Sequence, residues 1–255
     1  MTLDKKTKLF IILGSFFVTN AIVAEFIGAK IFSFEKTLGF NPFDINILGF
    51  EHLSFELTCG VILWPVVFIM TDIINEYYGK KGVKLLSYIT AGMIAYAFIM
   101  VFLAIRVTPA GWWTGSGGEK GVADMQAAYS AVFGQGLWII IGSLVAFLVG
   151  QIADVYVFHY LREKSGEKML WLRSTGSTLV SQFIDSFVVL FIAFYIGSDW
   201  SIQKVLAIGI MNYIYKFCIA IIITPFLYIL HNAIDKYLGR ELAHNMMNEA
   251  EKQYD

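Results

Sequence analysis

The sequence contains few of the residues that build disulfides, metal sites and soluble catalytic centres. Its 255 residues include only two cysteines and four histidines. Cys59 and Cys218 lie in apolar runs without a CxxC pair or histidines at ligand spacing, and we interpret both as small core residues. The patterns HExxH, GxSxG and GxxxxGK(S/T) do not occur. We therefore expect no catalytic residues, no metal and no cofactor, and we expect that the chain is not an enzyme.

Charged residues are scarce as well, at 15% of the chain, whereas 57% of the residues are hydrophobic and 16% are aromatic. The mean hydropathy of +0.65 lies far above that of ordinary soluble proteins. This composition excludes a soluble globular domain and predicts an all-α integral membrane protein that is surrounded by the lipid bilayer. The net charge of -1 provides no basic field, so nucleic acid is not expected as a partner.

Six apolar runs are long enough to cross a bilayer as helices, which takes about 20 residues. The first run is longer than the apolar segment of a signal peptide, so we treat it as a true span. We predict one transmembrane domain over residues 1–255, a six-helix bundle with spans at 9–30, 57–78, 83–106, 136–161, 171–197 and 202–232.

The basic residues predict the orientation of this bundle. Of the 19 Lys and Arg residues, 13 lie on one side of the predicted spans, in the two tails and after the second and fourth spans. Five lie on the other side, and Lys216 lies within the sixth span. Because Lys and Arg are concentrated in cytoplasmic loops, we expect both termini to be cytoplasmic and the protein to lie in the cytoplasmic (inner) membrane.

Two segments on the predicted outer side are unusual. Residues 31–56 contain six phenylalanines, too many for a solvated linker, and either fold over the outer mouth of the bundle or form an interfacial aromatic belt. Residues 108–134 are rich in glycine, which interrupts helices. Their later part, ADMQAAYSAVF, is predicted to form a short interfacial helix.

Polar side chains at membrane depth are costly, and in a bilayer they indicate function. The fifth span carries a polar stripe at helical spacing, formed by Ser174, Thr178, Gln182 and Asp185. The sixth span carries Lys216 near its centre, and an ammonium group at that depth needs a counter-ion. Because the midpoints of the two spans match, we predict an ion pair between Lys216 and Asp185. The pair is either structural or is broken when a ligand or an ion enters.

The buried polar groups are mostly acceptors and amides, a set that suits a planar ligand with several N–H groups whose ring stacks on aromatic side chains. We predict that this small-molecule ligand is bound by Asn20, Glu25, Gln151, Asp154, Gln182, Asp185, Asn212 and Lys216. The segment TDIINEYYG at 71–79 lies at the predicted cytoplasmic end of the second span. There we predict that Asp72 and Glu76 form an inner gate with Arg173 of the fifth span.

Five segments carry a distinctive combination of these residues. They are AEFIGAK at 24–30, TDIINEYYGKK at 71–81, AAYSAVFG at 127–134, GSLVAFLVGQIADVYV at 142–157 and WLRSTGSTLVSQFIDSFVV at 171–189. Together they resemble the queuosine precursor transporter family, also called the vitamin uptake transporter family. The family pattern carries over at Asp72, Glu76, Gln151, Asp154, Arg173, Gln182 and Asp185.

The resemblance implies a six-helix importer of the inner membrane, similar in fold to the substrate-binding subunits of energy-coupling-factor transporters. The implied cargo is a 7-deazaguanine precursor of the tRNA nucleoside queuosine, such as 7-cyano-7-deazaguanine or its aminomethyl analogue. A guanine-like edge offers N–H and amino donors to a carboxylate, and a carbonyl acceptor to Gln, Asn or Lys.

The sequence leaves the driving force open between an ion gradient, a separate energy-coupling module and trapping of the product, and it does not give the oligomeric state. One alternative function is a structural or assembly subunit of a membrane complex, in which the buried polar groups only pair helices. Another is an importer of a different purine-like or vitamin-like solute.

Overall fold

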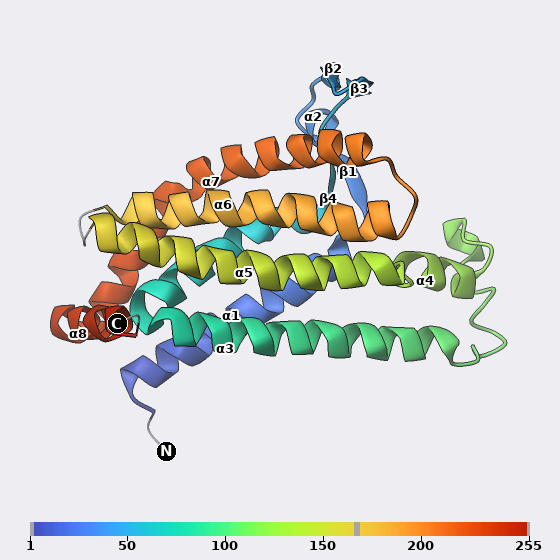
Figure 1. Ribbon diagram of the computed structural model, residues 1–255. Helices are drawn as coiled ribbons and strands as arrows, with labels where there is room; N and C mark the ends of the chain where they lie inside the picture. Colours follow the sequence, from blue (N-terminus) through green and yellow to red (C-terminus); the bar gives the residue numbers. More distant parts are fainter. Residues whose placement is uncertain (1–2, 166–168, 254–255) are drawn as a thin grey trace.

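The structure is a computed structural model that describes residues 3–165 and 169–253. This part of the chain is a bundle of long helices with two small two-stranded sheets (Figure 1). The α-helices are α1 Lys5–Ile27, α2 Phe34–Thr37, α3 Trp64–Arg106, α4 Met125–Phe133, α5 Leu137–Ser165, α6 Leu170–Leu190, α7 Ile202–Leu238 and α8 Arg240–Glu251. The strands are β1 Ile31–Ser33, β2 Ile45–Ile47, β3 Phe50–Leu53 and β4 Glu56–Thr58. Short 3₁₀ turns occupy Cys59–Ile62 and Gly118–Lys120, and a π-helical turn, Phe191–Ile196, extends α6.

Five helical segments of the described chain are long and apolar enough to cross a membrane, which agrees with the predicted all-α membrane class. They are Lys5–Ile27, Trp64–Arg106, Met125–Ser165, Leu170–Ile196 and Ile202–Leu238. Both termini lie at the same end of the bundle (Figure 1), where Lys5 donates a hydrogen bond to the Tyr237 carbonyl at 2.8 Å. Which side of the membrane this end faces stays a prediction.

Helix α3 contains most of both the second and the third predicted spans. It has 43 residues, and a straight helix of that length would measure about 65 Å, twice the thickness of the bilayer core. At Gly79 the backbone leaves helical geometry, with φ 67° and ψ -170°, and the ribbon runs in opposite directions before and after this kink (Figure 1). The count of six spans stays a prediction.

The predicted start of the second span at residue 57 is wrong. Residues 56–62 form β4 and a 3₁₀ turn, and the helix begins at Trp64. Pro65 lies in the first turn of α3, where its missing N–H costs no helical hydrogen bond and its fixed φ favours the helix start.

The kink at Gly79 is covered by the C-terminal segment. A side chain at this position would place its Cβ 2.9 Å from the Ala250 carbonyl oxygen, so the close approach requires glycine. The Gln253 side chain accepts a hydrogen bond from the Lys81 N–H at 3.1 Å and donates one to the Tyr78 carbonyl at 3.1 Å. These bonds satisfy backbone groups beside the kink and so stabilise the reversal of the chain.

Helix α6 packs against both α5 and α7 and organises the interior of the bundle (Figure 1). Small residues allow the close approach of α5, because a Cβ at Gly142 would lie 3.1 Å from the Val189 carbonyl oxygen of α6. The polar stripe of α6 reaches α3 at its first turns, where the Ser174 hydroxyl donates to Asp72.

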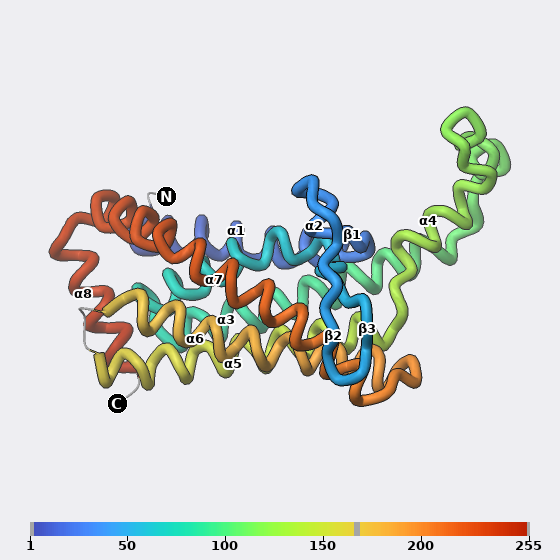
Figure 2. The backbone as a smooth tube through the Cα atoms, turned by 90° about the horizontal axis from the view of Figure 1, so that it is seen from above, coloured from blue at the N-terminus to red at the C-terminus, as the bar shows by residue number. Residues whose placement is uncertain are grey.

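The loop between α1 and α3, called here the outer loop after its predicted side, contains two antiparallel sheets, β1 with β4 and β2 with β3. One of its aromatic residues packs on the bundle, whereas the interfacial aromatic belt stays a prediction. Phe34 packs edge-on against Tyr215 of α7, with ring centroids 5.4 Å apart, whereas Phe40 and Phe43 are exposed. The predicted short helix is α4, and the segment between α3 and α4 extends beyond the bundle at the end away from the termini (Figure 2).

Glu35 in α2 holds the outer loop together. Its side chain is 1% exposed, and its Oε1 accepts a hydrogen bond from the Phe55 N–H at 2.8 Å. The Ser33 hydroxyl donates to Oε2 at 3.4 Å. Burial works to raise the pKa of Glu35, but hydrogen bonds from three backbone N–H groups and from Ser33 outweigh this effect and lower the pKa from its usual 4.5.

We predict that the outer loop opens in acid. Because the pKa of Glu35 is lowered in the folded loop, its carboxylate stabilises the loop above about pH 4.5, and this contribution is lost as the pH falls below that value. Hydrogen exchange of the Phe55 amide, corrected for the intrinsic effect of pH, should accelerate in this range. Glu35→Gln should exchange fast at every pH, whereas Glu51→Gln, at an exposed position of the same loop, should match the wild type. Slow exchange at pH 7 in Glu35→Gln would contradict this role.

Candidate functional site

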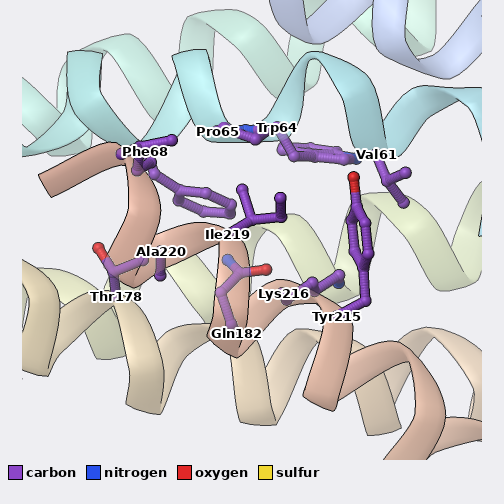
Figure 3. Close-up of a pocket in the computed structure, with 11 residues that line it drawn as sticks. Val61, Trp64, Pro65, Phe68, Thr178, Gln182, Tyr215, Lys216, Ile219 and Ala220 are labelled. Atoms are coloured by element: carbon purple, nitrogen blue, oxygen red, sulfur yellow. The ribbon is translucent and has the colours of Figure 1, made fainter. Parts of the chain in front are cut away.

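A pocket with aromatic walls, called here the aromatic pocket, lies between α3, α6 and α7 (Figure 3). Its cavity volume is about 20 Å³, so its walls lie close to one another. Its lining includes Trp64, Pro65 and Phe68 from α3, Thr178 and Gln182 from α6, and Tyr215, Lys216, Ile219, Ala220 and Ile223 from α7. The rings of Trp64 and Phe68 are stacked with centroids 5.9 Å apart, and the Tyr215 ring extends from α7 towards α3 (Figure 3). Aromatic rings from both α3 and α7 therefore form the walls of this pocket.

Gln182 brings a carboxamide group into the aromatic pocket, where it points towards α3 (Figure 3). Its side chain is 1% exposed, yet neither its amide nitrogen nor its oxygen has a hydrogen-bond partner within residues 3–165 and 169–253. Leaving such a group unpaired in the interior costs about 1–3 kcal/mol. The residue therefore does not serve stability, and its donor and acceptor are available to a ligand edge that offers both.

The predicted ion pair beside the aromatic pocket is present. The Lys216 ammonium donates to Asp185 Oδ2 at 2.5 Å and so joins α7 to α6. The two side chains are 13% and 18% exposed, so most of each charge is removed from water. Glu25 of α1 lies within range of the charge of Asp185, and its Oε1 accepts a hydrogen bond from Ser143 at 2.5 Å. Lys216 also lines the pocket, while its ammonium group is held by Asp185.

A second polar group, the carboxylate cluster, consists of Asp72, Glu76 and Asp154 with the arginines that bind Glu76. The Arg173 Nε and Nη2 atoms donate to the two oxygens of Glu76 at 3.1 and 2.6 Å, so the part of the predicted contact that joins Glu76 to Arg173 is present. Arg162 Nη1 lies 3.7 Å from Glu76 Oε2. All three side chains are nearly fully buried. A two-pronged contact between guanidinium and carboxylate is strong and directional, and it locks α3 to α6 at this level.

Hydroxyl groups hold the other two members of the carboxylate cluster. The Ser174 hydroxyl donates to Asp72 Oδ2, and the Ser181 hydroxyl donates to Asp154 Oδ1 at 3.2 Å. The charge of Asp154 also acts on Asp72, so the two carboxyl groups are neighbours. Asp154 was predicted to bind the ligand, but the structure places it near Asp72, which was predicted for the gate.

Three more of the predicted ligand residues lie apart from the aromatic pocket. Gln151 accepts a hydrogen bond from the Thr71 hydroxyl at 3.2 Å, beside the carboxylate cluster. Asn20 donates to the Phe16 carbonyl of its own helix at 2.8 Å. Asn212 is half-buried on α7 and does not belong to the lining formed by the described residues. The predicted set therefore divides, because the rotation of each helix about its axis decides which neighbour its polar face meets.

Arg162 and the aromatic walls are functional candidates that the sequence did not single out. Arg162 fits the pattern of positive loop charges, but it is 3% exposed and donates to the Met247 carbonyl of α8 at 3.1 Å. The sequence does contain a pattern that could have identified the aromatic walls. Trp64 and Phe68 precede Asp72 at intervals of four residues, so the three side chains share one face of the helix.

The structure thus holds two separate polar groups. Gln182 and Lys216 line the aromatic pocket, whereas the carboxylate cluster joins α3, α5 and α6 towards the end that holds α8. Within the described residues, no group of three or more His, Cys, Asp or Glu side chains has an arrangement that could hold a metal ion.

Comparison with known proteins adds independent findings. The model of the family described as "Putative vitamin uptake transporter" matches residues 58–230. The chain is similar to the "Probable queuosine precursor transporter" of Bacillus subtilis (strain 168), with 30% identity over 184 residues, which cover 70% of this chain and 73% of that protein. It is also similar to the "Queuosine precursor transporter" of Escherichia coli (strain K12), with 28% identity over 174 residues, 67% of this chain and 70% of that protein. No solved structure matches the chain.

Proposed function

Because the chain belongs to the vitamin uptake transporter family, we propose that this multi-pass membrane protein imports queuosine precursors, 7-deazaguanine bases such as 7-cyano-7-deazaguanine, into the cytoplasm. The names of the similar proteins from Bacillus subtilis, Haemophilus influenzae and Escherichia coli support a transporter role. The observation that carries the choice of cargo is Gln182, a buried amide without a partner among the described residues in a pocket with aromatic walls.

The chemistry of a 7-deazaguanine base suits this pocket. The base is flat and stacks on aromatic rings such as Trp64, Phe68 and Tyr215. Its lactam edge carries a carbonyl acceptor next to an N–H donor, which pairs with the donor and acceptor of the Gln182 amide. The Lys216 ammonium adds a charged donor for the carbonyl or for a nitrile nitrogen.

The carboxylate cluster forms the inner gate in this proposal. Glu76 of α3 and Arg173 of α6 hold the bundle closed on the side of α8, and Arg162 of α5 reinforces the contact. Release of the cargo requires these helices to separate at this level. The buried ion pairs must then exchange their partners for water, which makes opening a discrete step.

We predict that cells unable to synthesise or import the precursor regain tRNA queuosine from external 7-cyano-7-deazaguanine when they express this chain. Lys216→Gln should lower uptake at limiting cargo by about 10- to 100-fold, because a hydrogen bond from a charged group contributes about 1.5–3 kcal/mol. Lys236→Gln, at an exposed position of the same helix, should leave uptake unchanged. The measurement is labelled precursor in cells and in tRNA.

Three outcomes would defeat the proposal. Normal queuosine in cells that lack the chain and receive only the precursor would show another route of entry. A purified protein whose melting temperature responds to no deazapurine would favour the structural or assembly subunit, since a ligand that binds the native state raises that temperature. A response to a different purine-like or vitamin-like solute alone would favour an importer of that solute.

A further inference from the structure

Glu25 is a buried carboxyl group in α1 that has only neutral hydrogen-bond partners. It is 9% exposed, and its Oε1 accepts a hydrogen bond from the Ser143 hydroxyl of α5 at 2.5 Å. Its backbone carbonyl accepts a hydrogen bond from the Gln135 side chain at 3.0 Å. Among residues 3–165 and 169–253, no Lys, Arg or His nitrogen lies within 4.0 Å of the Glu25 carboxylate. An ionised carboxylate at this depth would therefore be uncompensated by direct contact.

Around Glu25 there are two carboxyl groups, Glu25 and Asp185, but one ammonium group, that of Lys216. Asp185 of α6 acts on Glu25 through its negative charge, and Lys216 of α7 is already in contact with Asp185 at 2.5 Å. Helix α3 faces the preceding turn of α1 with the apolar residues Ile94 and Phe98. The 3₁₀ turn that packs on α1 carries no acidic or basic side chain, its one titratable group being the thiol of Cys59. Two acids thus share one base, and the group is neutral only when one acid is protonated or binds a cation.

The geometry favours a proton over a metal cation. Many metal sites are built from several carboxylate, His or Cys side chains, and the described residues hold no group of three or more such side chains that could bind a metal ion. The Ser143 hydroxyl directs its hydrogen towards Glu25, so its donor is committed to the carboxyl group. A proton on the other oxygen neutralises Glu25 without further ligands.

We propose that Glu25 is the proton-binding site of this chain and that one proton enters on Glu25 with each cargo molecule. This inference rests on the proposed function, because it assigns the coupling ion of that transport. Cargo that accepts a hydrogen bond from Lys216 draws the ammonium away from Asp185. The charge of Asp185 is then less compensated, which disfavours the ionised form of Glu25. Cargo binding therefore promotes protonation of Glu25, and by linkage protonation promotes cargo binding.

Purified protein in liposomes tests the coupling. With an exterior about one pH unit more acidic than the interior, the wild type should accumulate labelled 7-cyano-7-deazaguanine about tenfold. A sodium gradient at equal pH should give no accumulation. Glu25→Gln, which keeps a neutral group of the same shape, should still exchange internal for external cargo but should not accumulate it. Glu119→Gln, at an exposed position of an outer loop, should behave as the wild type.

The outcomes separate the two proposals. If the wild type neither binds nor exchanges the cargo, the proposed function and the coupling both fail. If it exchanges cargo but ignores the pH gradient, or if Glu25→Gln accumulates as the wild type does, the coupling alone is overturned.

An infrared measurement covers the case in which Glu25→Gln fails to fold. The wild type should show a protonated-carboxyl carbonyl band that disappears on titration, and Ser143→Ala should move its frequency because the band loses a hydrogen bond. A spectrum without such a band, or with a band that Ser143→Ala does not move, would overturn the assignment to Glu25.

Discussion

Glu76→Gln should lower the free energy of unfolding by about 3–5 kcal/mol, because it leaves buried guanidinium charge without its counter-ion. Glu76 accepts two hydrogen bonds from Arg173, and Arg162 lies 3.7 Å from it, so one carboxylate compensates two cations. Glutamine keeps the shape and one acceptor but removes the negative charge. The two guanidinium groups then repel each other in an environment where water screens little.

Arg173→Met should cost less than Glu76→Gln, since Arg162 stays near Glu76 and continues to compensate its charge. Unfolding in denaturant, followed by tryptophan fluorescence in detergent, measures both changes. Glu249→Gln is the matched control, because its ion pair with Lys6 at 2.7 Å has side chains that are 65% and 43% exposed. Exposed pairs contribute about 0–1 kcal/mol, so the control should differ little from the wild type. A larger effect of Arg173→Met than of Glu76→Gln would contradict the shared role of Glu76.

The ion pairs of Glu76 with Arg173 and Arg162 also oppose opening of the proposed gate. These charged side chains therefore need other hydrogen-bond partners when the gate is open. Helix α8 offers them to Arg162. Its Met247 carbonyl accepts a hydrogen bond from Arg162 at 3.1 Å, and Glu251 lies 4.0 Å away. Helix α8 also covers the kink at Gly79, so it contacts both α3 and Arg162 of α5. Helix α8 thereby connects the kink at Gly79 with the proposed gate, at the end of the bundle where both termini lie.

The membrane class and both ion pairs of the proposed site were predictable because an unpaired charge in the lipid bilayer has a high free energy. An ammonium at the centre of a span demands a partner, and this requirement alone leads to the contact between Lys216 and Asp185. The same reasoning leads to Glu76 with Arg173, since both lie at the same end of their spans. The polar stripe of α6 follows from helical spacing.

The aromatic walls, Arg162 and the division of the ligand set were not predictable in the same way. With 22 phenylalanines, 13 tyrosines and six tryptophans, the sequence gives no reason to prefer Trp64 or Tyr215 over the others. In the sequence, Arg162 is explained by the concentration of Lys and Arg in cytoplasmic loops, so nothing there points to a buried partner. Gln151 lies at the proper depth for a ligand, but packing turns its face of α5 towards Thr71, and helix rotation is a property of the assembled bundle.

Gln182→Leu should separate stability from transport. Leucine fills most of the volume of glutamine and has no polar atoms, so it removes a buried amide that has no partner among the described residues. The free energy of unfolding should stay the same or rise by about 1–2 kcal/mol. The cargo concentration for half-maximal uptake should rise by about 10- to 100-fold, because two hydrogen bonds to the base are lost.

Ser186→Ala is the matched control for this change. Ser186 lies one turn beyond Gln182 on α6, is 1% exposed, and its hydroxyl likewise has no partner within the described chain, but it is not part of the pocket lining. Its replacement should leave uptake unchanged. A residue kept for packing would lose stability when replaced and would affect uptake only in proportion to the amount of folded protein. Reduced uptake by a Gln182→Leu protein of full stability therefore indicates that the amide contacts the cargo, whereas lower stability with unchanged uptake per folded molecule would remove Gln182 from the site.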